Sequence, residues 1–163
     1  AMHLWKQNPD RVDWHYLSFN LSALHFLKKN PKKINWEYLS LNKNAISLLE
    51  LEPDKIHWYN ISQNPNAIHI IEKNLDKVNW TSLSLNPNAI NILEKNLDKI
   101  DWYNLCLNPN AVHILEQNQE KITWFLLSKN PNAIELLEKN QDKINWVDLS
   151  ANPSIFEEVY ACK

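Results

Sequence analysis

The chain has 163 residues, a formal net charge of −2 and a hydrophobic fraction of 44%. This composition indicates a folded chain and excludes an extended disordered one, and the near-neutral charge disfavours nucleic acid and anionic membranes as partners. No apolar run approaches the roughly 18 residues that a membrane span requires, no signal-peptide pattern opens the sequence, and two cysteines indicate a reducing, intracellular compartment instead of a secreted protein.

Tryptophan recurs with a fixed period of 22 residues at seven positions: Trp14, Trp36, Trp58, Trp80, Trp102, Trp124 and Trp146. Such a period is typical of a tandem array whose units contact only their neighbours. We expect an all-α, right-handed solenoid-type array of about seven 22-residue repeats, with two short helices in each repeat. The array should form a single repeat domain over residues 1–163, made of a partial N-terminal repeat (1–9), six full repeats (10–141) and a divergent C-terminal capping repeat (142–163).

The first helix of each repeat should begin at the tryptophan. The residues immediately before each tryptophan are Asp13, Asn35, His57, Asn79, Asp101, Thr123 and Asn145. All of these except His57 are good N-cap residues, so the third unit should fray first. Apolar residues flank each cap at the spacing of a hydrophobic staple, as Ile34 and Leu39 do. We expect helices of about 7 to 10 residues, which are too short to be stable alone.

The second helix should begin at an asparagine that recurs in every repeat. These predicted helix caps are Asn20, Asn42, Asn64, Asn86, Asn108, Asn130 and Asn152. From Asn64 onward each is followed by proline, which is the expected order of a cap and a first helical residue. An apolar stripe follows, as in Ala67, Ile68, Ile70 and Ile71. The helices should stop near Asn74, Asn96, Asn118 and Asn140, where asparagine can adopt the left-handed conformation in a chain without glycine.

A leucine-rich repeat is the alternative fold, because its period of 20–29 residues includes 22. The segment Leu83–Asn86 resembles the strand of that repeat. However, the position after the serine is polar in other units, as at Gln63 and Lys129. The Asn-Pro pair also falls where a helix cap belongs, so the pattern favours the helical solenoid.

The repeat motif runs from Asn86 to Trp102 and recurs from Asn130 to Trp146. It resembles repeat proteins encoded by giant DNA viruses of amoebae, of the mimivirus and marseillevirus type. The closing Asn152-Pro-Ser-Ile-Phe156 resembles the way in which such arrays finish. The resemblance implies a viral repeat protein of the host cytoplasm or the virion, and it carries over no catalytic or ligand-binding residue.

Recognition should use positions that vary between repeats, and packing should use those that do not. The seven periodic tryptophans are therefore predicted to form the structural repeat core instead of a platform that stacks on bases. The two residues after each tryptophan vary and include aromatic side chains, which often anchor protein interfaces. The candidate partner-binding face is Tyr16, Tyr38, Tyr59, Tyr103, Phe125 and Leu126. The alternative is that these are tolerated surface residues beside the core.

The remaining polar columns give no sign of a metal or phosphate site. His3, His25, His69 and His113 share one repeat position, but successive members should lie roughly 10 Å apart, too far to share a metal ion. We expect them to face solvent. A basic row from Arg11 and Lys33 to Lys143 could follow phosphates, but an acidic row precedes it and offsets its field.

No paired nucleophile and base, phosphate loop or zinc spacing occurs in the sequence. We therefore expect no catalytic residue, no cofactor, no metal site and no small-molecule substrate. The expected function is a non-enzymatic protein-interaction scaffold that binds a host or viral protein or associates with itself. The alternatives are a nucleic-acid-binding helical repeat protein, which the charge disfavours, and a self-assembling structural protein.

Overall fold

The computed structural model describes residues 8 and 11–156, and all secondary structure in that part of the chain is helical. The chain divides into two compact units, Ala1–Asn79 and Trp80–Lys163. Trp-led helix pairs recur every 22 residues in both units, which confirms the all-α repeat array. No strand occurs in the described residues, so the leucine-rich alternative is wrong. A single domain over 1–163 stays a prediction, and the partial repeat at 1–9, except Asn8, lies outside the described residues.

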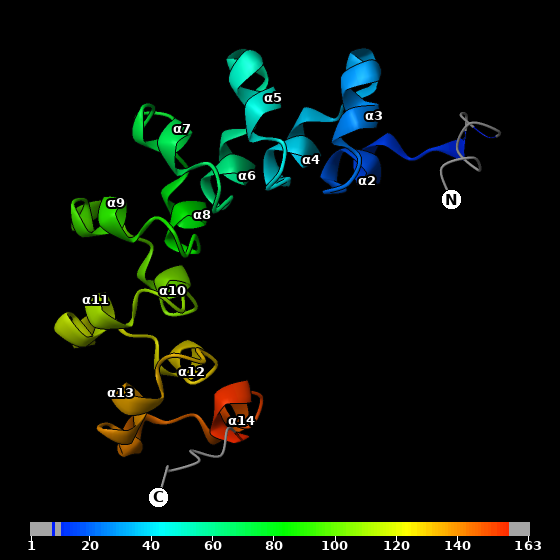
Figure 1. Ribbon diagram of the computed structural model, residues 1–163. Helices are drawn as coiled ribbons and strands as arrows, with labels where there is room; N and C mark the ends of the chain where they lie inside the picture. Colours follow the sequence, from blue (N-terminus) through cyan, green and yellow to red (C-terminus); the bar gives the residue numbers. More distant parts are fainter. Residues whose placement is uncertain (1–7, 9–10, 157–163) are drawn as a thin grey trace, which may run out of the picture. The chain divides into compact units, whose positions relative to one another are not determined.

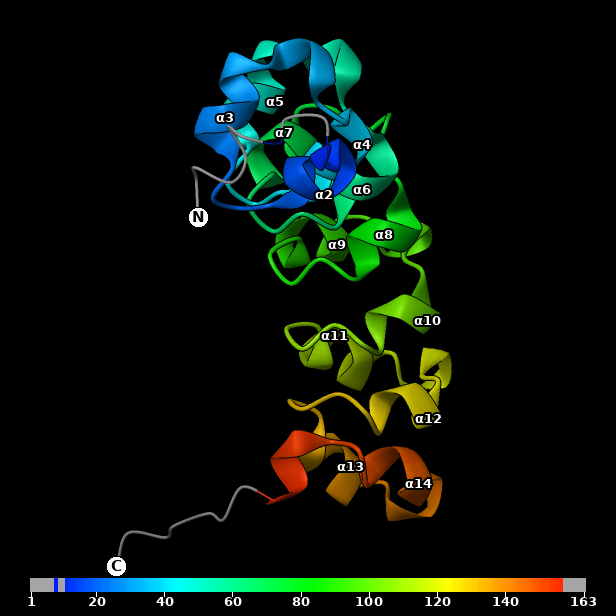
Figure 2. The same cartoon turned by 90° about the vertical axis from the view of Figure 1, so that its right-hand side faces the viewer.

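The first compact unit places its helices in two layers (Figure 1). The Trp-led helices α2, α4 and α6 contact one another in sequence and form one layer. The second helices α3, α5 and α7 form the other layer (Figure 2). The elements are α2 (Trp14–Phe19), α3 (Leu24–Lys29), η2 (Pro31–Lys33), α4 (Trp36–Leu41), α5 (Ile46–Leu51), η3 (Pro53–Lys55), α6 (Trp58–Ser62) and α7 (Ile68–Glu72), where η denotes a 3-10 helix.

The second compact unit repeats this arrangement. Its Trp-led helix α8 contacts α10, and α12 contacts α14. The elements are α8 (Trp80–Ser84), α9 (Ile90–Glu94), η4 (Leu97–Lys99), α10 (Trp102–Leu105), α11 (Val112–Gln117), η5 (Gln119–Lys121), α12 (Trp124–Leu127), α13 (Ile134–Glu138), η6 (Gln141–Lys143), α14 (Trp146–Leu149) and η7 (Pro153–Phe156). The end of the predicted capping repeat, residues 157–163, lies outside the described residues.

The core between the two layers consists of the aliphatic residues that the repeat pattern marked. Leu39 and Leu105, at the staple position of the first helices, are fully buried. Leu49 and Leu115, on the second helices, are buried equally completely. The six alanines at the starts of the second helices, such as Ala45, are also buried, and this lets the backbones approach closely.

The helices have only four to six residues, fewer than the predicted seven to ten. The second helix starts later than expected because the Asn-Pro-Asn segment first forms a turn, in which the Ala67 N–H donates to the Asn64 carbonyl at 3.1 Å. The N-cap is then Ala67, whose side chain cannot cap. A short 3-10 helix such as η3 precedes several Trp-led helices, and the sequence pattern did not predict it.

The recurring asparagines therefore do not cap the second helices, and the prediction that they do is wrong. They stand three residues before the alanines that occupy the N-cap position. Asn42 ends α4 as its C-cap, and its Oδ1 accepts the Asn44 N–H at 3.0 Å within the turn. Asn108 makes the same turn contact with Asn110 at 3.1 Å. The side chain shapes the turn because asparagine readily accepts a hydrogen bond from the backbone two residues further on.

Within each unit, the amide group of these asparagines also bonds to the preceding repeat. Asn42 Nδ2 donates to the carbonyls of Ser18 at 3.0 Å and Asn20 at 3.1 Å. In the second unit, Asn108 Nδ2 donates to the carbonyls of Ser84 and Asn86, both at 3.0 Å. These asparagines are fully buried, so the bonds form without competition from water and satisfy carbonyls at the ends of helices.

A buried serine forms a second link between repeats that the sequence pattern did not reveal. Ser84 Oγ donates to the Trp80 carbonyl at 2.8 Å and accepts the Asp101 N–H at 3.0 Å. Ser40 makes the same pair of bonds, to the Trp36 carbonyl and from the His57 N–H. The hydroxyl both donates and accepts, so one small side chain ties a helix end to the next repeat.

The second helices end without a left-handed residue. No described residue has a positive φ angle, which corrects the expectation for Asn74, Asn96, Asn118 and Asn140. Their Nδ2 groups instead donate to the carbonyl four residues earlier, as Asn118 does to Ile114 at 2.8 Å. The side chain thus satisfies a terminal carbonyl directly, and the backbone keeps an ordinary conformation.

The predicted caps of the first helices are largely confirmed. Asp13, Asn35, Asp101 and Asn145 each accept a backbone N–H of the first turn through their side chains. His57 makes no such bond, as expected. Thr123 also makes none, although threonine is a good cap residue.

Replacing His57 by aspartate should stabilise the protein. The aspartate side chain can accept a first-turn N–H of α6, as Asp101 does in α10, and we expect a gain of about 0.5–2 kcal/mol in the free energy of unfolding. Urea denaturation followed by circular dichroism measures the change. His57→Ala is the matched control and should leave the stability nearly unchanged, whereas a stabilising alanine would show that the gain does not come from capping.

The contribution of the buried amide bonds to stability can be measured by replacing two of the recurring asparagines, one that makes these bonds and one that does not. Asn108→Ala removes its turn contact and both bonds to the preceding repeat, and we expect a loss of about 2–4 kcal/mol in the free energy of unfolding. Asn20→Ala removes only the side-chain contact with Ser22 at an exposed position, so the loss should stay below about 1 kcal/mol. Equal losses in thermal denaturation would show that the inter-repeat bonds contribute little.

Candidate functional site

The tryptophan column is only partly buried. Trp14, Trp36, Trp58, Trp80, Trp102 and Trp124 are half-buried, and Trp146 is 66% exposed. The fully buried positions of the repeat are aliphatic, such as Leu39 and Leu105. The indoles therefore border the core that they were predicted to form, and one of their faces is available to a neighbour.

That face carries the lysine that stands three residues before the next tryptophan. The lysine Nζ lies near the indole centre, within the distance of a cation–π contact. The pairs are Lys33 on Trp14 at 5.2 Å, Lys55 on Trp36 at 4.8 Å, Lys77 on Trp58 at 5.5 Å, Lys99 on Trp80 at 4.9 Å and Lys143 on Trp124 at 4.6 Å. These five lysines of the basic row thus join one repeat to the next through the tryptophans.

A tryptophan whose ring is covered by a lysine should contribute more to the stability of the protein than a tryptophan whose ring is exposed. Trp124→Ala removes a half-buried ring with a lysine above it, and we expect a loss of about 2–3 kcal/mol in the free energy of unfolding. Trp146→Ala removes a mostly exposed ring, and the expected loss is below about 1 kcal/mol. Guanidinium denaturation of both variants tests this, and a larger loss at Trp146 would contradict it.

The two variable residues after each tryptophan differ in exposure. The first of them is exposed in every described repeat: His15, Glu37, Tyr59, Thr81, Tyr103, Phe125 and Val147. We call these residues the exposed row. The second position is exposed only at Tyr16 and is buried at Asn60 and Ser82. The second position therefore serves mostly for packing between first helices.

Leu126 was predicted to lie on the partner-binding face, and this prediction is wrong because the side chain is buried. It is 4% exposed, because it occupies the second position and points into the interior of the second unit. Tyr38, at the same repeat position, is half-buried. Tyr16, Tyr59, Tyr103 and Phe125 are exposed as expected. Adjacent residues on a short helix point about 100° apart, so one of the pair turns inward.

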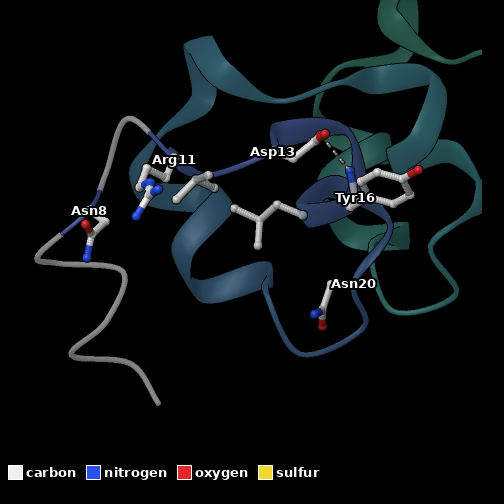
Figure 3. A pocket seen from close by; sticks show the side chains of 7 residues that line it. Asn8, Arg11, Asp13, Tyr16 and Asn20 are labelled. Carbon is white, nitrogen blue, oxygen red and sulfur yellow. Dashed lines mark hydrogen bonds between the residues drawn. The ribbon is translucent and has the colours of Figure 1, made fainter.

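Aromatic side chains gather on the exposed face of the first unit. Tyr38 lies edge-on against His15 at 5.6 Å and against Tyr16 at 6.5 Å between ring centres. Tyr16 is 72% exposed and borders an open cavity of about 510 Å³, which Asp13 and Asn20 also line (Figure 3). Edge-to-face contacts hold the rings in place, so the cluster presents an ordered apolar surface to solvent.

The Asp13 carboxylate beside this cluster is held in its charged form. Partial desolvation favours the neutral acid, but the N–H groups of Tyr16 and His15 outweigh it and lower the pKa of Asp13. The charge of the cap therefore persists at neutral pH, at the positive end of α2.

The second unit carries a smaller aromatic pair in the exposed row. Tyr103 and Phe125 lie edge-on at 6.2 Å between ring centres, and each is exposed by more than two fifths. They come from consecutive first helices, α10 and α12. Tyr59 of the first unit is exposed at the same repeat position.

The second helices carry charged side chains instead. His69 Nε2 lies 2.8 Å from Glu50 Oε1, and His113 Nε2 lies 2.8 Å from Glu94 Oε1. Lys139 pairs with Glu116 at 2.8 Å, and this hydrogen bond and charge raise the pKa of Lys139. The histidine column faces solvent as predicted, except that His3 lies outside the described residues.

Cys106 occupies a serine position of the buried link. Its Sγ donates to the Trp102 carbonyl at 3.2 Å and accepts the Thr123 N–H at 3.4 Å. Burial raises the pKa of this thiol, which keeps it protonated and suits a structural role.

Within residues 8 and 11–156, no cluster of three or more histidine, cysteine, aspartate or glutamate side chains has the arrangement of a metal site. The helices of that part of the chain are also too short and too polar to cross a bilayer.

The chain matches no protein-family model, no curated protein and no solved structure.

Proposed function

We propose that this chain is a non-enzymatic scaffold that binds a protein partner along its first helices. The observation that carries this proposal is the exposed row, which places Tyr59, Tyr103 and Phe125 in solvent at one repeat position. Tyrosine and phenylalanine bury much area at little entropic cost and anchor many interfaces. Their helices are fixed by buried links, so the row is ordered before a partner arrives.

The contacts of the basic row favour a protein over a nucleic acid. The lysines that could follow phosphates lie on indole rings, as Lys55 does on Trp36. Other cations pair with carboxylates, including Lys139 with Glu116. The indole faces that could stack on bases are partly covered by these lysines, and base stacking requires an open ring face.

We further propose that the protein is of viral origin and acts inside a cell or a virion. The repeat motif resembles giant-virus repeat proteins, and the buried protonated Cys106 suits a reducing compartment. We therefore place the scaffold in the cytoplasm of an infected host cell or in the virion, where its partner is a host or viral protein.

A triple variant tests the proposed surface. Tyr59→Ser, Tyr103→Ser and Phe125→Ser together remove three exposed rings, and the melting temperature should fall by only a few degrees because these rings are outside the core. Partners captured from infected-cell lysate by the wild-type chain, identified by mass spectrometry and then purified, should bind the variant at least tenfold more weakly in calorimetry.

The matched control is His25→Ser with His69→Ser, which changes exposed residues of the second helices and should leave partner binding unchanged. Loss of binding in the control, or full binding by the triple variant, would contradict the assigned surface. A gel-shift assay at low salt addresses the alternative function: micromolar, salt-sensitive binding of single- or double-stranded nucleic acid would favour a nucleic-acid-binding repeat protein.

A further inference from the structure

An open cavity lies between the second helices α5 and α7 of the first unit (Figure 1). Its volume is about 280 Å³, and Ile56, Trp58 and Ile70 form its apolar wall. Ile56 and Ile70 are buried and Trp58 is half-buried, so the wall belongs to the folded core and is in place before any ligand binds. Sites for small molecules usually measure roughly 300–1,000 Å³. This cavity is smaller, and it suits a side chain of a protein partner instead of a whole cofactor.

The rim of the cavity carries two exposed lysines, Lys73 and Lys77. Lys77 Nζ lies 5.5 Å from the centre of the Trp58 ring, which is the longest of the five lysine–tryptophan distances. Within residues 8 and 11–156, neither lysine forms an ion pair with a carboxylate. The rim therefore places two uncompensated positive charges beside an apolar wall.

A later repeat shows the partner that Lys73 lacks. Lys139 stands at the same repeat position and pairs with Glu116 at 2.8 Å. The counterpart of Glu116 in the first unit is Glu50, but Glu50 Oε1 lies 2.8 Å from His69 Nε2 instead. His69 therefore engages the carboxylate that would otherwise pair with Lys73.

We propose that this cavity binds an acidic segment of a partner protein, in which a carboxylate side chain stands next to an apolar one. The apolar side chain packs on Trp58 and Ile70, and the carboxylate meets Lys73 and Lys77. The partner's carboxylate thus replaces the ion pair that Lys139 makes within its own chain. No residue of the exposed row lines the cavity, so binding here succeeds or fails independently of binding at the exposed row.

The charges around the cavity favour a short acidic peptide over a nucleic acid. Glu50 lines the rim, and the exposed Glu52 and Asp54 stand at the neighbouring η3 turn. These carboxylates repel a phosphate backbone that continues past the two lysines, whereas one carboxylate side chain can meet the lysines alone. Lys77 also lies over the Trp58 ring, so the indole offers no open face to a base.

The test uses the full chain and the peptide N-acetyl-Leu-Glu-Leu-amide, which joins one carboxylate to two apolar side chains and carries no other charge. The matched peptide has glutamine in place of glutamate. Binding is followed by NMR through the indole N–H resonance of Trp58, which is identified by its absence from the spectrum of Trp58→Phe. A titration to about 10 mM detects a dissociation constant on the order of 1 mM. We expect a saturable shift, and binding of the glutamine peptide should be roughly threefold weaker, as expected for the loss of a surface ion pair.

Variants of Lys73 test the assigned charge. Lys73→Gln should weaken binding of the glutamate peptide roughly threefold. Lys73→Glu should reverse the preference, so that N-acetyl-Leu-Lys-Leu-amide binds more tightly than the glutamate peptide. A merely structural role of this lysine would not produce that reversal. The matched control is Lys43→Gln, which makes the same change of charge at an exposed position of the first unit outside the cavity and should leave binding unchanged. Circular dichroism with thermal melting confirms that each variant folds.

Several results would overturn the proposal. The Trp58 resonance could show no saturable shift, the glutamate and glutamine peptides could bind equally, or Lys43→Gln could weaken binding as much as Lys73→Gln. Sodium acetate and a short oligothymidine are the competing ligands. Binding of acetate as tight as that of the peptide would assign the rim to free anions, and tighter binding of the oligothymidine would assign it to nucleic acid.

Discussion

The buried asparagine amide is the interaction on which the rest of the structure depends. One side chain shapes a turn through its Oδ1 and holds the preceding repeat through its Nδ2, as Asn108 does. Helices of four to six residues cannot persist alone in water. They persist here because, within each unit, the asparagine of one repeat fixes helix ends of the repeat before it, where short helices leave most of their unpaired backbone groups.

This dependence explains why the chain needs no glycine. Tight turns and helix ends usually rely on a residue with positive φ, and the described residues contain none. The asparagine and serine side chains satisfy the terminal carbonyls and N–H groups directly, so the backbone stays in conformations that any residue adopts. The aliphatic residues supply the buried apolar surface. The hydrogen bonds of the asparagines and serines determine how one repeat is aligned on the next.

Much of the fold could be predicted from the sequence because periodicity reports packing directly. The caps at Asp13 and Asn35, and the buried leucines such as Leu39, follow from local spacing. The bonds that the asparagine amide makes to the preceding repeat could not be predicted in this way, because they join residues 22 to 24 positions apart and leave no local pattern in the sequence. The inward turn of Leu126 was missed for a similar reason: neighbouring first helices decide which of two adjacent residues is buried.

The sulfur atom of Cys106 makes the junctions of the second unit unequal. Its contacts, at 3.2 Å and 3.4 Å, replace hydroxyl bonds of 2.8 Å and 3.0 Å at the equivalent Ser84. Thr123, which follows at the same junction, makes no side-chain cap bond. Thiols are weaker hydrogen-bond partners than hydroxyls, so the serine-type link between α10 and α12 is weaker than the links on either side of it within the second unit. One substitution of an atom, sulfur for oxygen, thus makes chemically unequal two junctions that the 22-residue period would make the same.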